Sequence, residues 1–270
     1  MAIAIREDAG LPRAEVARFS ELEPTFGQAY DPDASAASRF FAAGQALLDR
    51  LPPRPRRSQP AQAAADELKA HLRSARVAFL RRNADTLYAR LTRNLSQFVR
   101  VEELVYAAAG AVPGLVPTRD QIRAERELQQ KDKEGHEVDQ GLFLSQVLSQ
   151  PRAGGHLVHA MLRPRSESIQ ALAEFQRLGR LELGATSVVR EGAVGYLYHG
   201  NPRYLNAEDD STTSTLEIGT DLILLDPAID VGVIRGKVVE HPRYAGLQFL
   251  QLGIWRVHRL APVPRLGAAC

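Results

Sequence analysis

The spacing of apolar residues divides the chain into a helical first half and a mixed second half. The segment 38–50 holds Phe40, Phe41, Leu47 and Leu48, and apolar side chains then recur every three or four residues along a stripe that starts at Leu68 and continues to Phe98. This period places them on one face of a helix, so both segments are predicted to be amphipathic helices. The prolines of 51–60 separate the two helices, because proline cannot continue a helix.

Further helix signals follow this stripe. The segment 107–117 holds glycine and proline residues and is predicted to interrupt the helical pattern. Thr118 lies three residues before Gln121, which is the spacing of a capping box. A new helix is therefore predicted to begin there and to carry the charge-dense run 123–141.

The pattern changes near residue 180. An apolar stripe over 166–178 predicts one more helix, with Gly179 as its C-cap. The segment 181–200 is rich in β-branched and aromatic residues and predicts a β-hairpin. A helix over 211–225 and a short buried strand over 231–236 follow, and this order predicts an α/β unit in which the strand after the helix pairs in parallel.

Composition excludes several classes of protein. The chain has 270 residues, 44% of them hydrophobic, which suffices for one or two domains. Its 34 basic and 32 acidic side chains leave a net charge of +2, which gives no electrostatic case for nucleic acid or a membrane surface as partner. The single cysteine, Cys270, excludes an internal disulfide framework. No apolar stretch approaches the length of a membrane span, so a cytoplasmic protein is expected.

The residues show no metal-binding constellation. His156 and His159 lie three residues apart and could share a helix face, but no carboxylate or cysteine is spaced to complete a site. A structural role is the favoured interpretation for both. No glycine-rich phosphate loop or nucleophile elbow is present either. The residues alone therefore predict a helical domain followed by an α/β domain, and no activity.

Several segments carry a resemblance to a known family. NPRYLNAE (201–208) matches the x-P-x-x-L-N-A segment with which members of the crotonase (enoyl-CoA hydratase) superfamily leave a strand and hold coenzyme A. An ordinary strand-to-helix loop is the alternative interpretation. LLDPAIDVGVIRGKVVEHPRYAG (224–246), KEGHEVDQGLF (133–143) and HLVHAMLRP (156–164) are similar to the branch of this superfamily that oxidises 3,5-dihydroxyphenylacetyl-CoA with O2. The resemblance extends from about residue 45 to residue 246.

The resemblance implies an α + α/β protein. A helical N-terminal domain over 1–180 would precede the first part of a crotonase-type β/α spiral domain over 181–270. From residue 247 the sequence departs from the family: LQFLQLGIW stands where the family has a segment like RRVFSAGINL. We therefore expect a truncated fold, a strand at 231–235 that lacks neighbours on one side, and a chain that is weak or inactive alone.

The resemblance also implies a chemistry. Enzymes of this branch use no metal and no organic cofactor; coenzyme A is part of the substrate and O2 is the co-substrate. They yield an arylglyoxylate and serve glycopeptide antibiotic biosynthesis. Removal of a proton beside the thioester gives an enolate, whose charge two backbone N–H groups stabilise in an oxyanion hole. The electron-rich dihydroxyaryl enolate can then pass an electron to O2 directly.

Individual residues receive roles by their position in these motifs. Gly253-Ile254 is in register with the family's Gly-Ile, so the Ile254 N–H is a candidate oxyanion donor. Glu208 would be a buried carboxylate that accepts a hydrogen bond from a ring hydroxyl; its alternative role is that of a helix N-terminal acid, which Asp209 or Asp210 could serve instead. The remaining candidates are His241, Pro242, Arg243 and Tyr244 for the substrate, and Arg203 and Tyr204 for coenzyme A.

Arg243 and Tyr204 have alternative structural roles, and the chain has alternative functions. Arg243 could be a surface-loop arginine, and Tyr204 could pack in the core. Another crotonase-superfamily acyl-CoA enzyme, a hydratase or thioesterase, is a second hypothesis, although such enzymes normally hold their acid/base carboxylates in the part of the fold that is absent here. A non-catalytic truncated subunit is a third. A homo-oligomer, trimer or hexamer, is expected for a complete protein by analogy with the family.

Overall fold

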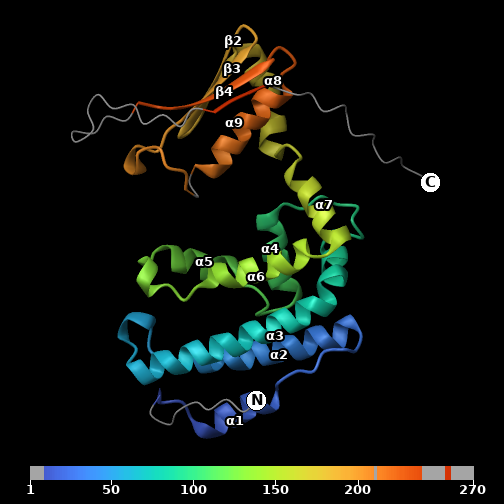
Figure 1. The fold of residues 1–270 in the computed structure, drawn as a ribbon, viewed down its shortest axis with the longest axis vertical. Helices are drawn as coiled ribbons and strands as arrows, with labels where there is room; N and C mark the ends of the chain where they lie inside the picture. Colours follow the sequence, from blue (N-terminus) through green and yellow to red (C-terminus); the bar gives the residue numbers. More distant parts are fainter. Residues whose placement is uncertain (1–8, 210–211, 239–252, 257–270) are drawn as a thin grey trace. The chain divides into compact units, whose positions relative to one another are not determined.

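The computed structural model describes residues 9–209, 212–238 and 253–256. The chain forms two compact units, Met1–Leu162 and Arg163–Cys270. The described part of the first unit is helical, and that of the second combines a sheet with two helices (Figure 1). Each unit has its own apolar core. This mixed architecture is compatible with the predicted α + α/β class.

The first unit is built on two long helices that lie side by side, α2 (Tyr30–Leu48) and α3 (Gln59–Leu91) (Figure 1). They confirm the helices predicted from residues 38 and 68 onward. Phe40 and Phe41 of α2 and Leu68 and Phe79 of α3 are fully buried between them and their neighbours. The other described helices of this unit are α1 (Arg13–Glu21), α4 (Val101–Ala111), α5 (Arg119–Arg126), α6 (His136–Leu148) and α7 (Pro151–Met161).

Helix α3 ends earlier than the apolar stripe predicts. Its last residue is Leu91, and Arg93, Asn94 and Leu95 follow with φ angles of 48°, 55° and 66°. Three consecutive residues in the left-handed region turn the chain out of the helix. The apolar pattern nevertheless continues, because Leu95 packs against the core of the unit. The prediction that one helix extends to Phe98 is therefore wrong.

The segment between α4 and α6 confirms two expectations and corrects one. The capping box is present: the Thr118 N–H donates to Gln121 Oε1 (2.8 Å), and the Gln121 N–H donates to Thr118 Oγ1 (3.3 Å). The predicted interruption within 107–117 is also present, since α4 ends at Ala111 and α5 begins at Arg119. The prediction of a single helix over 123–141 is wrong. Gly135, with a φ of 87°, separates α5 from α6.

His156 packs between helices and has a structural role, as the sequence analysis favoured. Its Nδ1 lies 2.8 Å from the hydroxyl of Tyr88, and its ring stacks on Phe98 with centroids 4.5 Å apart. Burial raises the pKa of Tyr88 to about 12. The tyrosine therefore stays protonated and α7 is held against α3.

The second unit has a five-stranded sheet in the order β1-β2-β3-β4-β5. β3 and β4 pair in parallel, which confirms the prediction for the strand after the helix, and the other pairs are antiparallel. The expectation that the strand at 231–235 lacks a neighbour is wrong, because β5 pairs with β4. The strands are β1 (Arg180–Leu183), β2 (Thr186–Glu191), β3 (Val194–His199), β4 (Val231–Gly236) and β5 (Gly253–Arg256); the helices are α8 (Ser166–Leu178) and α9 (Thr213–Leu225).

The two units divide between Leu162 and Arg163, whereas the sequence placed the boundary at 180/181. Helix α8 accounts for the difference, because it contacts α9 and β1. Its residue Phe175 is fully buried in the core of the second unit. Helical periodicity identified α8 correctly, and Gly179 caps it with a φ of 68°, but periodicity does not show which core a helix joins.

A glycine lets helix α9 lie close to the sheet. A Cβ at Gly219 would lie 2.6 Å from Leu197 Cδ1 and 2.9 Å from Val188 Cγ2. Gly195, Leu197 and His199 are the buried residues of β3, as the two-residue period of a strand requires for one covered face. This packing holds α9 against β2 and β3.

The end of α9 is tied to the sheet by an ion pair. Arg190 Nη1 donates to Asp226 Oδ2 (2.7 Å), and the Asp226 carboxylate is almost fully buried. Asp226 Oδ1 also accepts the N–H of Ala228 (3.0 Å), which begins the turn into β4. The predicted end of this helix at Asp226-Pro227 is thus confirmed.

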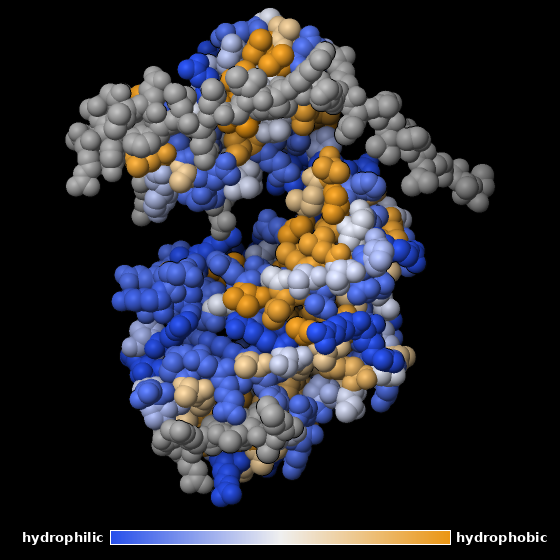
Figure 2. Space-filling view, viewed as in Figure 1, coloured by the Kyte–Doolittle hydropathy of each residue, from blue (hydrophilic) through white to orange (hydrophobic). Residues whose placement is uncertain are grey.

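Apolar side chains are exposed around α6 and α7. Figure 2 shows them gathered there, on a first unit whose visible face is otherwise largely hydrophilic. An oligomer contact would bury such side chains at low desolvation cost. The oligomeric state itself stays a prediction. The exposed large apolar residues in this region are Val138, Leu148, Val158, Met161 and Leu162.

Gly219→Ala tests the packing of α9. The added methyl group would overlap Leu197 and Val188, so we expect the substitution to destabilise the second unit by about 1–3 kcal/mol. Gly155 of α7 is the matched control, because nothing lies within 4 Å of its Cβ position. Gly155→Ala should stabilise its helix by about 0.5–1 kcal/mol. Urea unfolding followed by circular dichroism measures both, and equal effects of the two substitutions would contradict this packing.

Candidate functional site

The segment that resembles the coenzyme A loop lies at the carboxyl end of the parallel strands. It leaves β3 after His199 and enters α9 at Thr213, and His199 pairs with Gly236, the last residue of β4. In open α/β sheets, ligands bind outside the carboxyl ends of the parallel strands. The loop is therefore at the edge where a substrate site is expected.

Two buried asparagines close this loop on itself. The Asn201 N–H donates to Asn206 Oδ1, and the Asn206 N–H donates to the Asn201 carbonyl, both over 2.8 Å. Their side chains are 8% and 3% exposed. Leu205 and Asn206 have φ angles of 55° and 64°, and asparagine is among the residues that tolerate this left-handed region best. The reciprocal hydrogen bonds hold that backbone conformation in place.

The same asparagines anchor the loop to its surroundings. Asn206 Nδ2 donates to the carbonyl of Lys237 (2.7 Å), just after β4. Asn201 Nδ2 donates to the Ala207 carbonyl (2.8 Å) and to Asp209 Oδ2 (2.9 Å). The loop is thus connected to the ends of both parallel strands and to the start of α9.

Asp209 serves the start of helix α9. Its carbonyl accepts the N–H groups of Thr212 (3.0 Å) and Thr213 (3.1 Å), and its own N–H donates to Thr212 Oγ1 (3.0 Å). Asp209 thus contributes main-chain hydrogen bonds to this helix start, and no hydrogen bond of Glu208 to it is seen among the described residues. Glu208 is exposed and has no hydrogen-bond partner among the described residues, so the expectation of a buried carboxylate does not hold.

The structure describes only some of the other residues that the sequence predicted to contact coenzyme A or the substrate. Tyr204 is 51% exposed, so core packing is not its role. Arg203 lies in the short 3-10 turn Pro202–Tyr204. Arg203, Tyr204 and Glu208 are thus brought onto one loop. The positions His241, Pro242, Arg243 and Tyr244 lie outside the described residues.

Gly253 and Ile254 begin β5, where they lie opposite Ile234 and Val233 of β4. In an antiparallel ladder, alternate residues direct their N–H groups toward the partner strand and away from it. An oxyanion donor has to be a residue whose N–H points away from β4. The role of Ile254 as this donor stays a prediction.

His199 is a candidate that the sequence analysis missed. Its side chain is buried, at 3% exposure, and neither ring nitrogen has a hydrogen-bond partner in the part of the chain that the structure describes. It lies across from Thr186, whose hydroxyl is 2.9 Å from that of Thr215 in α9. A buried polar group without a partner is costly, and such groups gather at functional sites. Its position directly before the Gly-Asn-Pro turn was the signal that could have found it.

Within the described ranges, no group of three or more histidine, cysteine, aspartate or glutamate side chains is arranged to hold a metal ion. In the same residues, no helix combines the length and apolar character needed to span a membrane.

Comparison with known proteins identifies a relative. No protein-family model matches the chain. The chain is, however, 42% identical over 231 residues to the (3,5-dihydroxyphenyl)acetyl-CoA 1,2-dioxygenase of Amycolatopsis orientalis. The chain is a relative of this dioxygenase. The match covers 86% of the chain, which is more than the helical unit alone could supply, and it confirms the resemblance to the dioxygenase branch. The chain spans 53% of the relative's length.

Two substitutions at Asn206 separate hydrogen bonding from backbone strain. Asn206→Gly removes the side-chain hydrogen bonds but tolerates the positive φ, and we expect it to cost about 1–3 kcal/mol of unfolding free energy. Asn206→Ala adds the left-handed strain of a residue with a Cβ, for about 1–2 kcal/mol more. Urea unfolding of the two variants measures the difference. An alanine variant as stable as the glycine variant would show that the positive φ is not maintained.

Proposed function

We propose that this protein acts as a cofactor-independent dioxygenase on 3,5-dihydroxyphenylacetyl-CoA. The reaction consumes one O2 and gives 3,5-dihydroxyphenylglyoxylate and free coenzyme A. Both oxygen atoms enter the product, and the two protons of the substrate methylene leave on the carboxyl group and the thiol. The observation that carries the proposal is the 42% identity to a dioxygenase of this name across 86% of the chain.

The site at the carboxyl end of β3 and β4 would recognise the aryl thioester. Glu208 is exposed there and is not used by the helix start, which Asp209 serves instead. A carboxylate that accepts a hydrogen bond from a ring hydroxyl orients the ring and makes it more electron-rich. An electron-rich enolate gives up an electron to O2 more readily, which is the step that a metal would otherwise assist.

The thioester end of the substrate would meet backbone N–H groups. Deprotonation beside the thioester places negative charge on its oxygen, and preorganised N–H donors stabilise this charge in a site from which water is excluded. We assign one such donor to Ile254 and the coenzyme A contacts to Arg203 and Tyr204. A crotonase-type β/α spiral, to which β3, α9 and β4 would belong, is the corresponding proposal for the fold.

The two other hypotheses have less support. A hydratase or thioesterase would need its own acid/base carboxylates, and no observation favours that chemistry over the dioxygenase reaction of the relative. A non-catalytic subunit that associates with full-length subunits is distinguished by the assay below. Cytoplasmic localisation, a role in antibiotic biosynthesis and assembly into trimers or hexamers stay predictions.

Oxygen consumption by the purified chain tests the proposed function. With 3,5-dihydroxyphenylacetyl-CoA and a chelator present, we expect oxygen uptake equal in moles to coenzyme A release. Glu208→Gln should lower the rate by roughly tenfold to a hundredfold, because it removes a charge-assisted hydrogen bond worth about 1.5–3 kcal/mol.

Glu191→Gln is the matched control, since Glu191 is an exposed glutamate at the opposite end of β2 and β3. Its rate should be unchanged. A folded chain without oxygen uptake would contradict the dioxygenase proposal and favour the non-catalytic subunit. Uptake that the chelator abolishes would contradict cofactor independence.

A further inference from the structure

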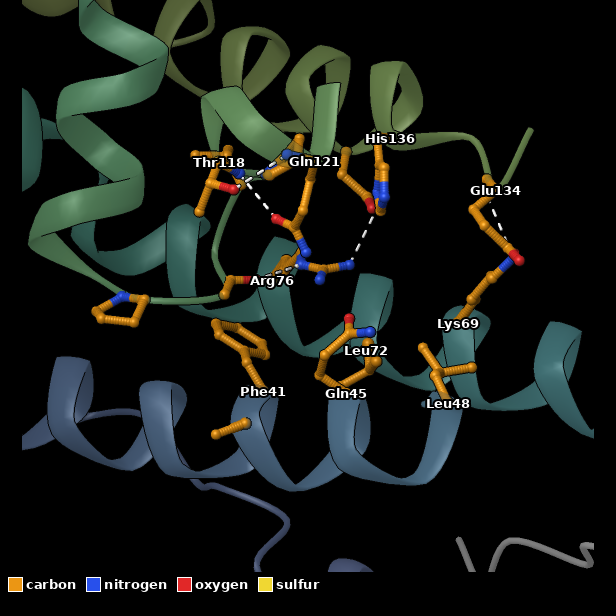
Figure 3. A pocket seen from close by; sticks show the side chains of 16 residues that line it. Phe41, Gln45, Leu48, Lys69, Leu72, Arg76, Thr118, Gln121, Glu134 and His136 are labelled. Carbon is orange, nitrogen blue, oxygen red and sulfur yellow. Dashed lines mark hydrogen bonds and ion pairs between the residues drawn. The ribbon is translucent and has the colours of Figure 1, made fainter. Parts of the chain in front are cut away.

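A hollow in the helical unit has the character of a small-molecule site. It has a volume of about 460 Å³, within the usual range for ligand pockets. Helices α2, α3 and α5, the loop before α5 and the start of α6 surround it (Figure 3). Its apolar wall consists of Phe41, Leu48, Leu72 and Val116. All of its lining residues belong to the first unit, and none belongs to the loop of the candidate thioester site.

A buried guanidinium lies at the centre of this hollow. The Arg76 side chain is only 11% exposed; its Nε donates to the Gly114 carbonyl (3.0 Å), and its Nη1 lies 3.3 Å from Asp139 Oδ1. Its guanidinium lies over the Phe41 ring, 5.3 Å from the centroid, and its Nη2 has no hydrogen-bond partner among the described residues. Burial lowers the pKa of Arg76 below its ordinary value, but an arginine stays charged at neutral pH. A buried cation with a free donor is a site for an anionic group.

Neutral polar groups converge on the same space. Figure 3 shows Gln45, Gln121 and His136 around the Arg76 guanidinium, each from a different helix. Gln121 uses its Oε1 to accept the Thr118 N–H, which leaves its amide N–H groups for a ligand. A planar carboxylate can accept hydrogen bonds from a guanidinium and from such amides at the same time.

The carboxylates around the hollow already have partners. Two carboxylates, Glu134 and Asp139, are surrounded by four cations. A third carboxylate, Glu125, accepts the N–H groups of Gly135 (2.8 Å) and His136 (3.0 Å). The second guanidinium nitrogen of Arg76, Nη2, is therefore the feature that favours an anionic ligand. The ion pairs are Lys69–Glu134, Arg57–Glu134 (2.8 Å), Arg73–Asp139 (2.8 Å) and Arg76–Asp139 (3.3 Å).

We propose that this hollow binds a small monocarboxylate with an apolar or aromatic body. The carboxylate pairs with Arg76 and accepts hydrogen bonds from the amides of Gln45 and Gln121. The body lies against the accessible apolar residues of the lining, Ala42, Leu48 and Pro113. This binding site does not depend on the dioxygenase proposal, because no residue of the second unit takes part in it.

Titration of the full chain with phenylacetate tests the site. Backbone amide NMR signals of Gly114, Thr118 and Gln121 should shift saturably, with a dissociation constant of about 1 mM or below for so small a ligand. Phenylacetamide has the same shape without the charge, and we expect it to bind at least about tenfold more weakly. No saturable shift, or equal binding of the amide, would overturn the proposal.

Two glutamines in similar surroundings, one in the hollow and one outside it, provide a test variant and its control for the phenylacetate titration. Gln45 and Gln62 each donate to an aspartate four residues later on an exposed helix face, Asp49 (2.8 Å) and Asp66 (2.7 Å), but Gln62 does not line the hollow. Gln45→Glu places a negative charge beside the carboxylate and should weaken phenylacetate binding by about tenfold or more. Gln62→Glu should leave it within about twofold. Equal weakening by both would overturn the proposal.

Arg76→Gln should abolish the phenylacetate shifts. Because Arg76 also contacts Asp139, circular dichroism has to show that this variant is folded. If it is not folded, the Gln45 and Gln62 pair decides the result, since neither substitution touches the Arg76 contacts. A folded Arg76→Gln chain that binds phenylacetate as well as the unaltered chain would overturn the proposal.

Discussion

The reciprocal hydrogen bonds between Asn201 and Asn206 are the constraint on which the candidate thioester site depends. They close a loop whose backbone passes through two left-handed residues, a conformation that a chain without such bonds would leave readily. Because Asn206 also binds the carbonyl after β4, the loop cannot shift without breaking contacts to the parallel strands. The loop therefore presents its side chains from a fixed position.

The rest of the second unit supports this arrangement. Gly219 allows α9 to approach the sheet closely, and the Arg190–Asp226 ion pair holds the C-terminal end of this helix. Asp209 serves the helix start, so Glu208 needs no structural partner and is available to a substrate. His199, buried beside the same loop without a partner among the described residues, is a second polar group that the local fold does not use.

The sequence predicted what depends on local pattern. Helical period identified α2, α3 and α8, and the order of elements predicted the parallel pairing of β3 and β4. The end of α3 at Leu91 escaped, because Arg93, Asn94 and Leu95 turn the chain out of the helix while Leu95 keeps the apolar period. His199 and the hollow at Arg76 escaped for another reason. Burial without a partner, and a pocket assembled from four helices, are tertiary properties that no local pattern records.

Anaerobic equilibrium binding tests the central claim most directly, because it compares substrates that differ only at the ring hydroxyls and involves no turnover. If the closed loop presents Glu208 to the ring, the chain should bind 3,5-dihydroxyphenylacetyl-CoA at least about tenfold more tightly than phenylacetyl-CoA, as a charge-assisted hydrogen bond allows. Glu208→Gln should remove most of this preference. Equal affinities for the two thioesters, or a preference that survives in Glu208→Gln, would contradict the account.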